Sequence, residues 1–225
     1  MAGMRQIKGS IVSRETSAKR LSSRALCNVK MPQRAPRRTV KPAGNALLRH
    51  FRVGRPAAGS NPSRGKILAG ALVLPCALGK TGIKARKREG DHASPLGTYR
   101  LLGGFFRADR MPRPRSLVPL RVLRPDMGWC DDTRSFLYNR PMRLPAKVKS
   151  KLSHEVLWRE DHLYDLMIIL DHNQCPRVRG HGSAIFLHCA RPDFVPTEGC
   201  IALPLPVLRK LLPRLSRGCT LRIGR

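Results

Sequence analysis

The stretch GSAIFLHCARPDFVPTEGCIALP, residues 182–204, predicts a strand, a loop and a second ordered element. Its first part enters through Gly182 and stays apolar up to His188, which is typical of a strand. Two prolines and a glycine then favour a loop, and apolar residues resume directly after Cys200 as a strand or a helix. Because a loop of this length can return the chain to a neighbouring strand, His188 and Cys200 are candidates for side chains that meet.

Short apolar runs separated by Gly, Pro and Asp continue this texture from Lys66 onward. Such runs, bounded by turn residues, indicate short strands. We interpret five of them as strands or extended pieces: KILAGALVLPCALG (one or two strands), SPLGTYRLLGGFF, SFLYNRPMRLP, LYDLMIILDHN and CTLRIG. The fourth is continuously apolar in its middle, so it is expected to be buried.

One segment after Cys200 is predicted to be a helix. Four leucines recur there at helical spacing: Leu208, Leu211, Leu212 and Leu215. Pro206 suits a first turn and Gly218 a C-terminal stop, while Pro213 should kink or shorten the helix. Many short strands with one helix predict a mostly β domain over residues 65–225, a sandwich or partly closed barrel with a minor helical part.

The charge of the chain is strongly one-sided, with 44 Lys and Arg against 14 Asp and Glu and a formal net charge of +30. Such a chain is expected to bind polyanions: nucleic acid, anionic lipid or an acidic polymer of the cell envelope. Residues 1–64 are rich in Arg, Ser, Ala, Pro and Gly and are predicted to form a disordered basic arm. This arm suits a nucleic-acid tail, a tether to an anionic surface or a targeting segment, unless the true start lies downstream, at Met31 for instance.

The apolar runs of the sequence indicate neither a secretory signal nor a membrane span. No apolar run follows the early cations, so no secretory signal is visible. The longest run, ILAGALVLPCALG, is interrupted by Pro75 and is shorter than the roughly 20 residues that a span needs. The seven cysteines are odd in number, irregularly spaced and without a CxxC pair, which argues against a disulfide framework.

Cys200 is the candidate nucleophile. A glycine immediately before a nucleophile, here Gly199, allows a tight turn that brings backbone N–H groups toward a reacting carbonyl. A thiol attacks as the thiolate, and a nearby imidazole such as that of His188 is the usual means of lowering its pKa. On spacing alone, a lone Cys and His twelve residues apart favour the alternative, a buried structural thiol with a strand-end histidine.

A metal site is the second alternative. Its ligands would come from five residues: His172, His181, His188, Cys189 and Cys200. Zinc sites usually show paired short spacings, and none occurs here. His188 and Cys189, adjacent in a strand, are also expected to point to opposite faces. We therefore predict no metal and no other cofactor.

Residues 182–204 resemble the signature of the L,D-transpeptidase catalytic domain (YkuD-type). In that family a strand ending in His is followed by a loop and a Ser/Thr-His-Gly-Cys segment. The matching residues here are His188, Thr197, Gly199 and Cys200. Upstream, REGDHASPLGTYRL at residues 88–101 is similar to the family's TPTGTF turn and strand, with Ser94, Pro95, Gly97 and Thr98 in the matching places. The resemblance covers roughly residues 66–225.

This resemblance implies a β-rich, sandwich-like fold and a cysteine acyltransferase that acts on peptidoglycan stem peptides. Cys200 would attack the carbonyl before a terminal D-amino acid, and the thioester would pass to an amine of another stem or of a protein. His188 would serve as general base and acid, with the amides of Gly199 and Cys200 as oxyanion donors. Apart from the resemblance, three residues are candidates for substrate contacts: Thr197, Arg191, which is otherwise one more surface cation, and His172, whose LDHN stretch is otherwise an Asx-type turn. The implied location is the periplasm or cell envelope.

Three departures mark the chain as a divergent member. Glu198 stands where the family has His, and its charge would raise the pKa of the thiol unless a base such as Arg191 pairs with it. Ala202 replaces the usual Arg or Asn, and the loop from His188 to Cys200 is shorter than usual. Transpeptidation is the first hypothesis; the alternatives are a catalytically silent peptidoglycan-binding module and a carboxypeptidase-type hydrolase. A basic nucleic-acid-binding protein is the last, since no recognition motif accompanies the charge, and no specific nucleic acid is expected.

Overall fold

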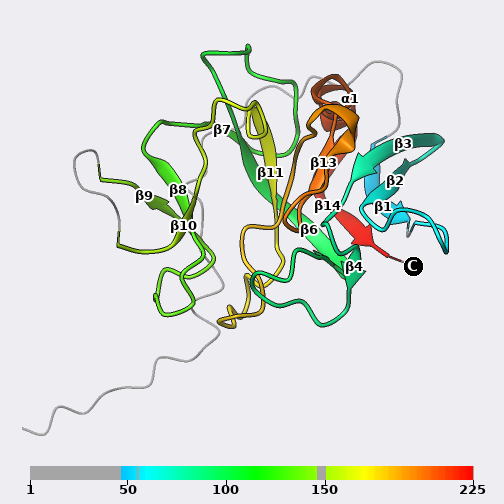
Figure 1. Cartoon of the computed structure of the whole chain (residues 1–225). Coiled ribbons are helices and arrows are strands. Elements are labelled where there is room, and N and C mark those ends of the chain that lie inside the picture. The colour runs from blue at the N-terminus through cyan, green and yellow to red at the C-terminus, as the bar shows by residue number, and fades with distance from the viewer. Residues whose placement is uncertain (1–46, 55, 146–150, 225) are drawn as a thin grey trace, which may run out of the picture. The chain divides into compact units, whose positions relative to one another are not determined.

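A computed structural model describes residues 47–54, 56–145 and 151–224. Their main sheet has nine strands in the order β11-β12-β13-β3-β2-β1-β14-β6-β7, and a further pairing of β11 with β6 closes the first eight into a barrel (Figure 1). Its strands are β1 (Leu48–Gly54), β2 (Arg64–Ala69), β3 (Leu72–Ala77), β6 (Gly97–Phe106), β7 (Leu120–Val122), β11 (Leu166–Leu170), β12 (Phe186–Cys189), β13 (Ile201–Leu203) and β14 (Leu215–Ile223). Two smaller sheets join β10 (His154–Val156), β8 (Met127–Cys130) and β9 (Arg140–Arg143), and β4 (Ile83–Lys84) with β5 (Ser94–Pro95).

Closure of the barrel depends on close contact between β6 and β11. Gly104 pairs with Ile168 in this antiparallel ladder, and a side chain at Gly104 would collide with the Met167 carbonyl oxygen. Two adjacent glycines in the middle of a strand would ordinarily weaken it, because they add flexibility and pack nothing. Here Gly104 allows the two backbones to approach closely enough for the ring to close.

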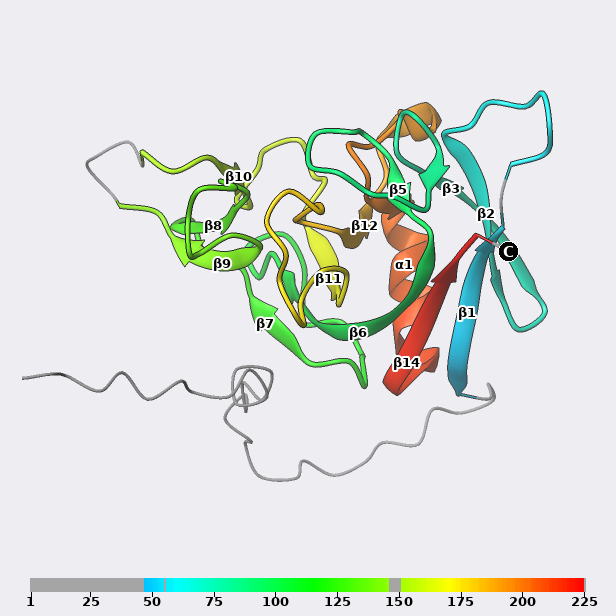
Figure 2. The ribbon, with the colours of Figure 1, turned by 90° about the horizontal axis from the view of Figure 1, so that it is seen from below.

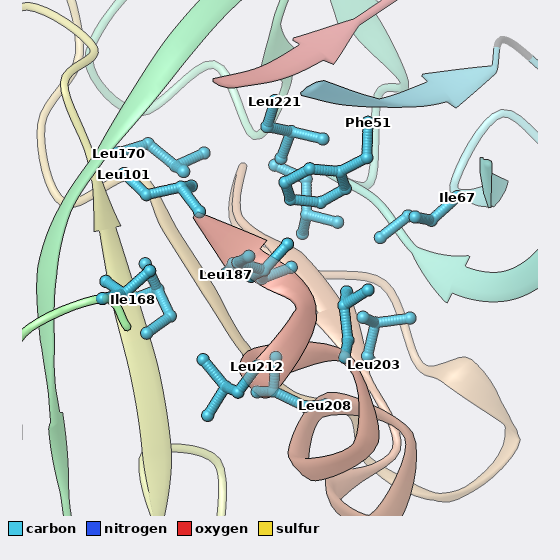
Figure 3. Close-up of a cluster of buried hydrophobic side chains, with 14 of the residues drawn as sticks. Phe51, Ile67, Leu101, Ile168, Leu170, Leu187, Leu203, Leu208, Leu212 and Leu221 are labelled. Atoms are coloured by element: carbon cyan, nitrogen blue, oxygen red, sulfur yellow. The ribbon is translucent and has the colours of Figure 1, made fainter. Parts of the chain in front are cut away.

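The barrel interior holds the main apolar core, which includes Phe51, Ile67, Leu187 and Leu221. One end of the barrel is covered by the helix α1 (Leu205–Leu211) and the turn η3 (Leu212–Arg214). In Figure 2 α1 lies behind the centre of the ring, and Figure 1 places it at the upper end. Figure 3 shows its leucine side chains packed against the strand residues.

A second apolar cluster lies outside the barrel, between the β11–β12 face and the β10-β8-β9 sheet. Its members include Trp129, Tyr164, Phe186 and Cys200. The Trp129 and Phe186 rings meet edge to face with centroids 5.1 Å apart, an arrangement that aromatic pairs favour. The candidate nucleophile is therefore part of this outer cluster.

The mostly β prediction is confirmed, and the barrel is closed rather than partly open. The helix is shorter than predicted, because Leu215 already begins β14 and Gly218 lies within that strand. Pro213, which has no backbone N–H, lies in the η3 turn where the helix ends. In the described residues no helix is long and apolar enough to span a membrane.

The folded part begins earlier than the predicted boundary at residue 65. Strand β1 pairs with both β2 and β14, and its Phe51 and Val53 are buried. Three basic residues, Arg49, His50 and Arg52, interrupt its apolar pattern, so the sequence alone does not indicate a strand here. The rest of the predicted arm, residues 1–46, lies outside the described residues.

Two neighbouring leucines on β6 offer a test of the barrel core. Leu101 is 7% exposed and packs inside, whereas Leu102 is 42% exposed on the outer face. We expect Leu101→Ala to lower the free energy of unfolding by about 2–5 kcal/mol, because it leaves a cavity, and Leu102→Ala to lower it by less than about 1 kcal/mol. Urea unfolding followed by circular dichroism measures both, and equal losses would contradict this description of the core.

Candidate active site

Parallel pairing of β12 with β13 brings Cys200 beside the strand that carries His188. The register joins Leu187 with Ile201 and His188 with Ala202, so Cys200 lies just before its strand and next to Phe186. The backbone N–H of Phe186 donates to Cys200 Sγ at 3.3 Å. Since alternate residues of a strand share a face, His188 and Cys200 project from the same side of the sheet on a diagonal.

Adjacent residues of β12 face opposite ways, as predicted. Cys189 belongs to the core inside the barrel, where its Sγ lies 3.5 Å from the Leu166 carbonyl oxygen. The His188 ring instead meets the Tyr164 ring edge to face, with centroids 5.3 Å apart, in the outer cluster. Cys189 is therefore a packing residue, and the adjacent pair is not arranged as two ligands of one metal.

The His188 imidazole is held in a single tautomer. Its Nδ1 lies 2.8 Å from the Cys189 carbonyl oxygen, which can only accept a hydrogen bond. Nδ1 must therefore carry the proton, and Nε2 keeps the lone pair that a general base uses. Only 3% of the residue is exposed, and this burial lowers the pKa of His188 to about 4. The ring is therefore neutral at pH 7, and burial makes it a weak proton acceptor in the free protein.

The Cys200 thiol is also neutral in the free protein. It is 7% exposed, and burial raises its pKa to about 12, although the Phe186 amide lowers it. Its S–H donates to the Ala184 carbonyl oxygen at 3.1 Å. The thiol thus has to transfer its proton to a base before it can attack, and no thiolate–imidazolium pair is present at rest.

The two segments that match the family signature meet at the Cys200 backbone. The Thr197 hydroxyl donates to the Cys200 carbonyl oxygen at 2.7 Å, and the Ser94 hydroxyl reaches the same oxygen at 3.4 Å. Ser94 also accepts from the Gly79 N–H at 3.0 Å, and Gly79 pairs with Thr197 in a parallel bridge. Thr197, predicted to bind substrate, is therefore engaged in holding the loop that carries Cys200.

Gly199 is required by the packing of this loop. Its φ is 139°, which favours glycine, and a Cβ there would lie 2.8 Å from the Ala93 carbonyl oxygen. Its N–H donates to Thr197 Oγ1 at 3.2 Å. As an oxyanion donor, Gly199 would have to exchange this partner for the substrate, so its predicted role stays a proposal.

Glu198 forms an ion pair with His92 and not with Arg191 as expected. Its carboxylate contacts His92 Nδ1 from the loop before Ser94. Arg191 instead donates to Asp161 at 3.0 Å. The predicted Arg191–Glu198 pair does not form, and a substrate carboxylate at Arg191 would have to share it with Asp161.

His172, the remaining predicted substrate contact, lies in a separate loop network. Its Nε2–H donates to the His181 carbonyl oxygen at 3.0 Å. Its ring meets the Tyr99 ring edge to face, with the ring centroids 5.5 Å apart. Burial is the main cause that lowers its pKa. Gly182 packs against His172 and against Lys87, a buried lysine that donates to Asp91 at 2.6 Å. No described contact links His172 directly with Cys200.

Sequence reasoning missed the aromatic support of His188. Tyr164 packs edge to face against both His188 and Phe186. Its hydroxyl donates to Glu155 at 3.1 Å, and burial is the main cause that raises the pKa of Tyr164 well above its ordinary value. Tyr164 lies in LYDLMIIL, directly before a buried strand, but nothing in that pattern identifies its partners.

The described residues contain no group of three or more His, Cys, Asp or Glu side chains arranged to hold a metal ion. Five of the described cysteines are free and buried: Cys76, Cys130, Cys189, Cys200 and Cys219. The chemistry that the site offers comes from the thiol, the imidazole and the backbone donors around them.

The resting protonation state predicts how Cys200 reacts with iodoacetamide. With the pKa of the thiol at about 12, the alkylation rate should rise about tenfold per pH unit between pH 7 and 10. Peptide-level mass spectrometry follows Cys200 separately from the other buried thiols. A rate that is already constant above about pH 6 would instead reveal a thiolate–imidazolium pair at rest.

Two variants that both break the Glu198–His92 pair should have different effects on this rate. The charge of Glu198 raises the pKa of Cys200, so Glu198→Gln should speed alkylation about two- to fivefold at pH 8. His92→Asn keeps the carboxylate and should not speed it. Acceleration by both variants would mean that loosening of the loop, and not charge, controls the thiol.

A family model described as the L,D-transpeptidase catalytic domain (YkuD) matches residues 64–223. The match spans more than half of the 225-residue chain and includes every strand of the barrel except β1. It contains both segments that meet at Cys200. Comparisons with curated proteins and with solved structures gave no match.

Proposed function

Because the chain belongs to the L,D-transpeptidase catalytic domain (YkuD) family, we propose that it transfers acyl groups between peptidoglycan stem peptides through a thioester on Cys200. The observation that carries this proposal is the shared face of Cys200 and His188 beside the paired strands. The fixed tautomer of His188, with Nε2 unprotonated, adds to it. Together they supply a nucleophile and a base in a site that excludes most water.

The first half-reaction begins with transfer of the Cys200 proton to His188 Nε2. The thiolate attacks the carbonyl carbon that precedes the terminal D-amino acid, a C–S bond forms, and the carbonyl oxygen becomes an oxyanion. Backbone N–H groups of Gly199 and Cys200 are the proposed donors to this oxyanion. His188 then protonates the leaving nitrogen, the C–N bond breaks, and the D-amino acid departs.

The second half-reaction reverses these roles. An acceptor amine attacks the thioester while His188 accepts its proton, a new C–N bond forms, and the C–S bond breaks. The Cys200 thiolate regains the proton from His188. Water in place of the amine would give carboxypeptidase-type hydrolysis, and the acceptor decides between the two outcomes. Arg191 and His172 are kept as proposed substrate contacts, and Thr197 as the residue that holds the loop for attack.

We propose the periplasm or cell envelope as the location of this chemistry, and the family assignment supports it. Peptidoglycan stem peptides are the proposed partners, and the reaction as written needs no cofactor. The function served is cross-linking or remodelling of the wall.

Intact-protein mass spectrometry after incubation with a disaccharide-tetrapeptide tests the proposal. We expect a thioester adduct on Cys200 with release of the terminal D-amino acid, and no adduct with Cys200→Ala. His188→Gln should slow adduct formation by about a hundredfold to ten-thousandfold, because it removes the base. A folded protein that binds the peptide without adduct or release would identify a silent binding module. Release without cross-linked product, even with acceptor peptide present, would identify a hydrolase.

A further inference from the structure

A concave surface lies apart from Cys200, between the loop before β7 and the α1–η3 segment. It is an open hollow of about 580 Å³. Its lining consists of Arg113, Pro114, Arg115, Leu205, Pro206, Arg209, Lys210 and Pro213. We call this surface the α1 groove.

The α1 groove is basic at its edges and apolar between them. Four of its lining residues are cations and none is acidic. Within the described part of the chain, none of these four takes part in an ion pair, whereas Arg107, Arg110 and Arg159 are each paired with carboxylates. Positive charges gathered without a counter-charge favour an anionic ligand.

Two features fix the shape of the α1 groove before any ligand binds. The Arg113 guanidinium donates to the Leu120 carbonyl oxygen at 2.9 Å and lies 5.1 Å from the centroid of the Phe106 ring. Prolines at positions 114 and 213 restrict the backbone on its two sides. A preformed surface loses less entropy when it binds a partner.

The α1 groove and the nucleophile lie at opposite ends of β13. Cys200 immediately precedes this strand, and α1 begins two residues after it. A strand rises about 3.3 Å per residue, so the two places are separated by roughly 10 Å or more along the chain direction. An extended polymer can contact both places at once.

We propose that the α1 groove is a second binding site, which holds carboxylate-bearing peptide segments of the cell-wall polymer while another segment reacts at Cys200. The identification of the polymer as cell-wall polymer rests on the proposed function. The preference of the groove for an anionic ligand is independent of that function. Arginine side chains bind carboxylates through paired N–H donors. The small apolar side chains that lie between the carboxylates of such a peptide would cover Leu205, Pro206 and Pro213. A phosphate chain has no apolar groups that could do so.

Binding of full-length Cys200→Ala protein to purified peptidoglycan sacculi tests this site without catalysis. In that background, the triple change Arg115→Gln, Arg209→Gln and Lys210→Gln should weaken binding about tenfold or more. The control is Arg52→Gln, Lys66→Gln and Arg222→Gln, which removes the same charge from exposed positions of β1, β2 and β14. Thermal unfolding verifies that both variants fold.

Equal weakening by the two triple variants would overturn the site, because net charge alone would then explain binding. Competition provides the second arm. An acidic peptide that contains alanines should displace the protein from sacculi at lower concentration than inorganic polyphosphate of equal charge, and the reverse order would overturn the assignment to peptide.

The same substitutions in the protein with Cys200 intact separate this inference from the proposed function. Adduct formation on a soluble disaccharide-tetrapeptide should be unchanged, while turnover of intact sacculi should fall at low substrate concentration. Loss of the adduct would show that the α1 groove belongs to the Cys200 site and would overturn its independence. Failure of the unsubstituted protein to form an adduct would defeat the proposed function and leave the Cys200→Ala binding result to decide the groove.

Discussion

Parallel pairing between β12 and β13 is the interaction on which the site depends. It sets His188 opposite Ala202 and thereby puts Cys200 on the diagonal beside it. A slip of one residue would turn His188 into the barrel and Cys189 out of it, because the side chains of a strand alternate. The closed ring prevents such a slip, since each strand of the pair is also bonded to a neighbour on its other side.

Burial gives the site its chemical character. The same desolvation raises the pKa of Cys200 and lowers that of His188, so both groups are neutral before substrate arrives. A neutral thiol in a dry pocket is protected from alkylation and oxidation, which attack thiolates. In the proposed reaction, its reactivity depends on the substrate, whose carbonyl develops a charge that backbone donors would stabilise. Substrate binding and activation of Cys200 would then be coupled.

Much of the site was predictable because it follows from local patterns. The alternation of His188 and Cys189 comes from the two-residue period of a strand, and the need for glycine at position 199 follows from the turn before the nucleophile. The partners of these residues come from distant parts of the chain. The contacts of Glu198 with His92 and of His188 with Tyr164 arise from the packing of separate loops, which no local pattern specifies. Strand β1 was missed because its outward positions are basic and only Phe51 and Val53 are buried.

That strand has a consequence for where the folding unit begins. The family match starts at residue 64, beyond the end of β1, although β1 lies between β2 and β14 in the ring. A chain shortened to residues 64–223 would lack β1, so the barrel would open between β2 and β14. Each of these two strands would then have an edge with a row of unpaired N–H and C=O groups. Such edges recruit strands from other molecules. Strand β1, with Phe51 buried at its centre, therefore covers two strand edges that the shortened chain would expose to pairing with other molecules.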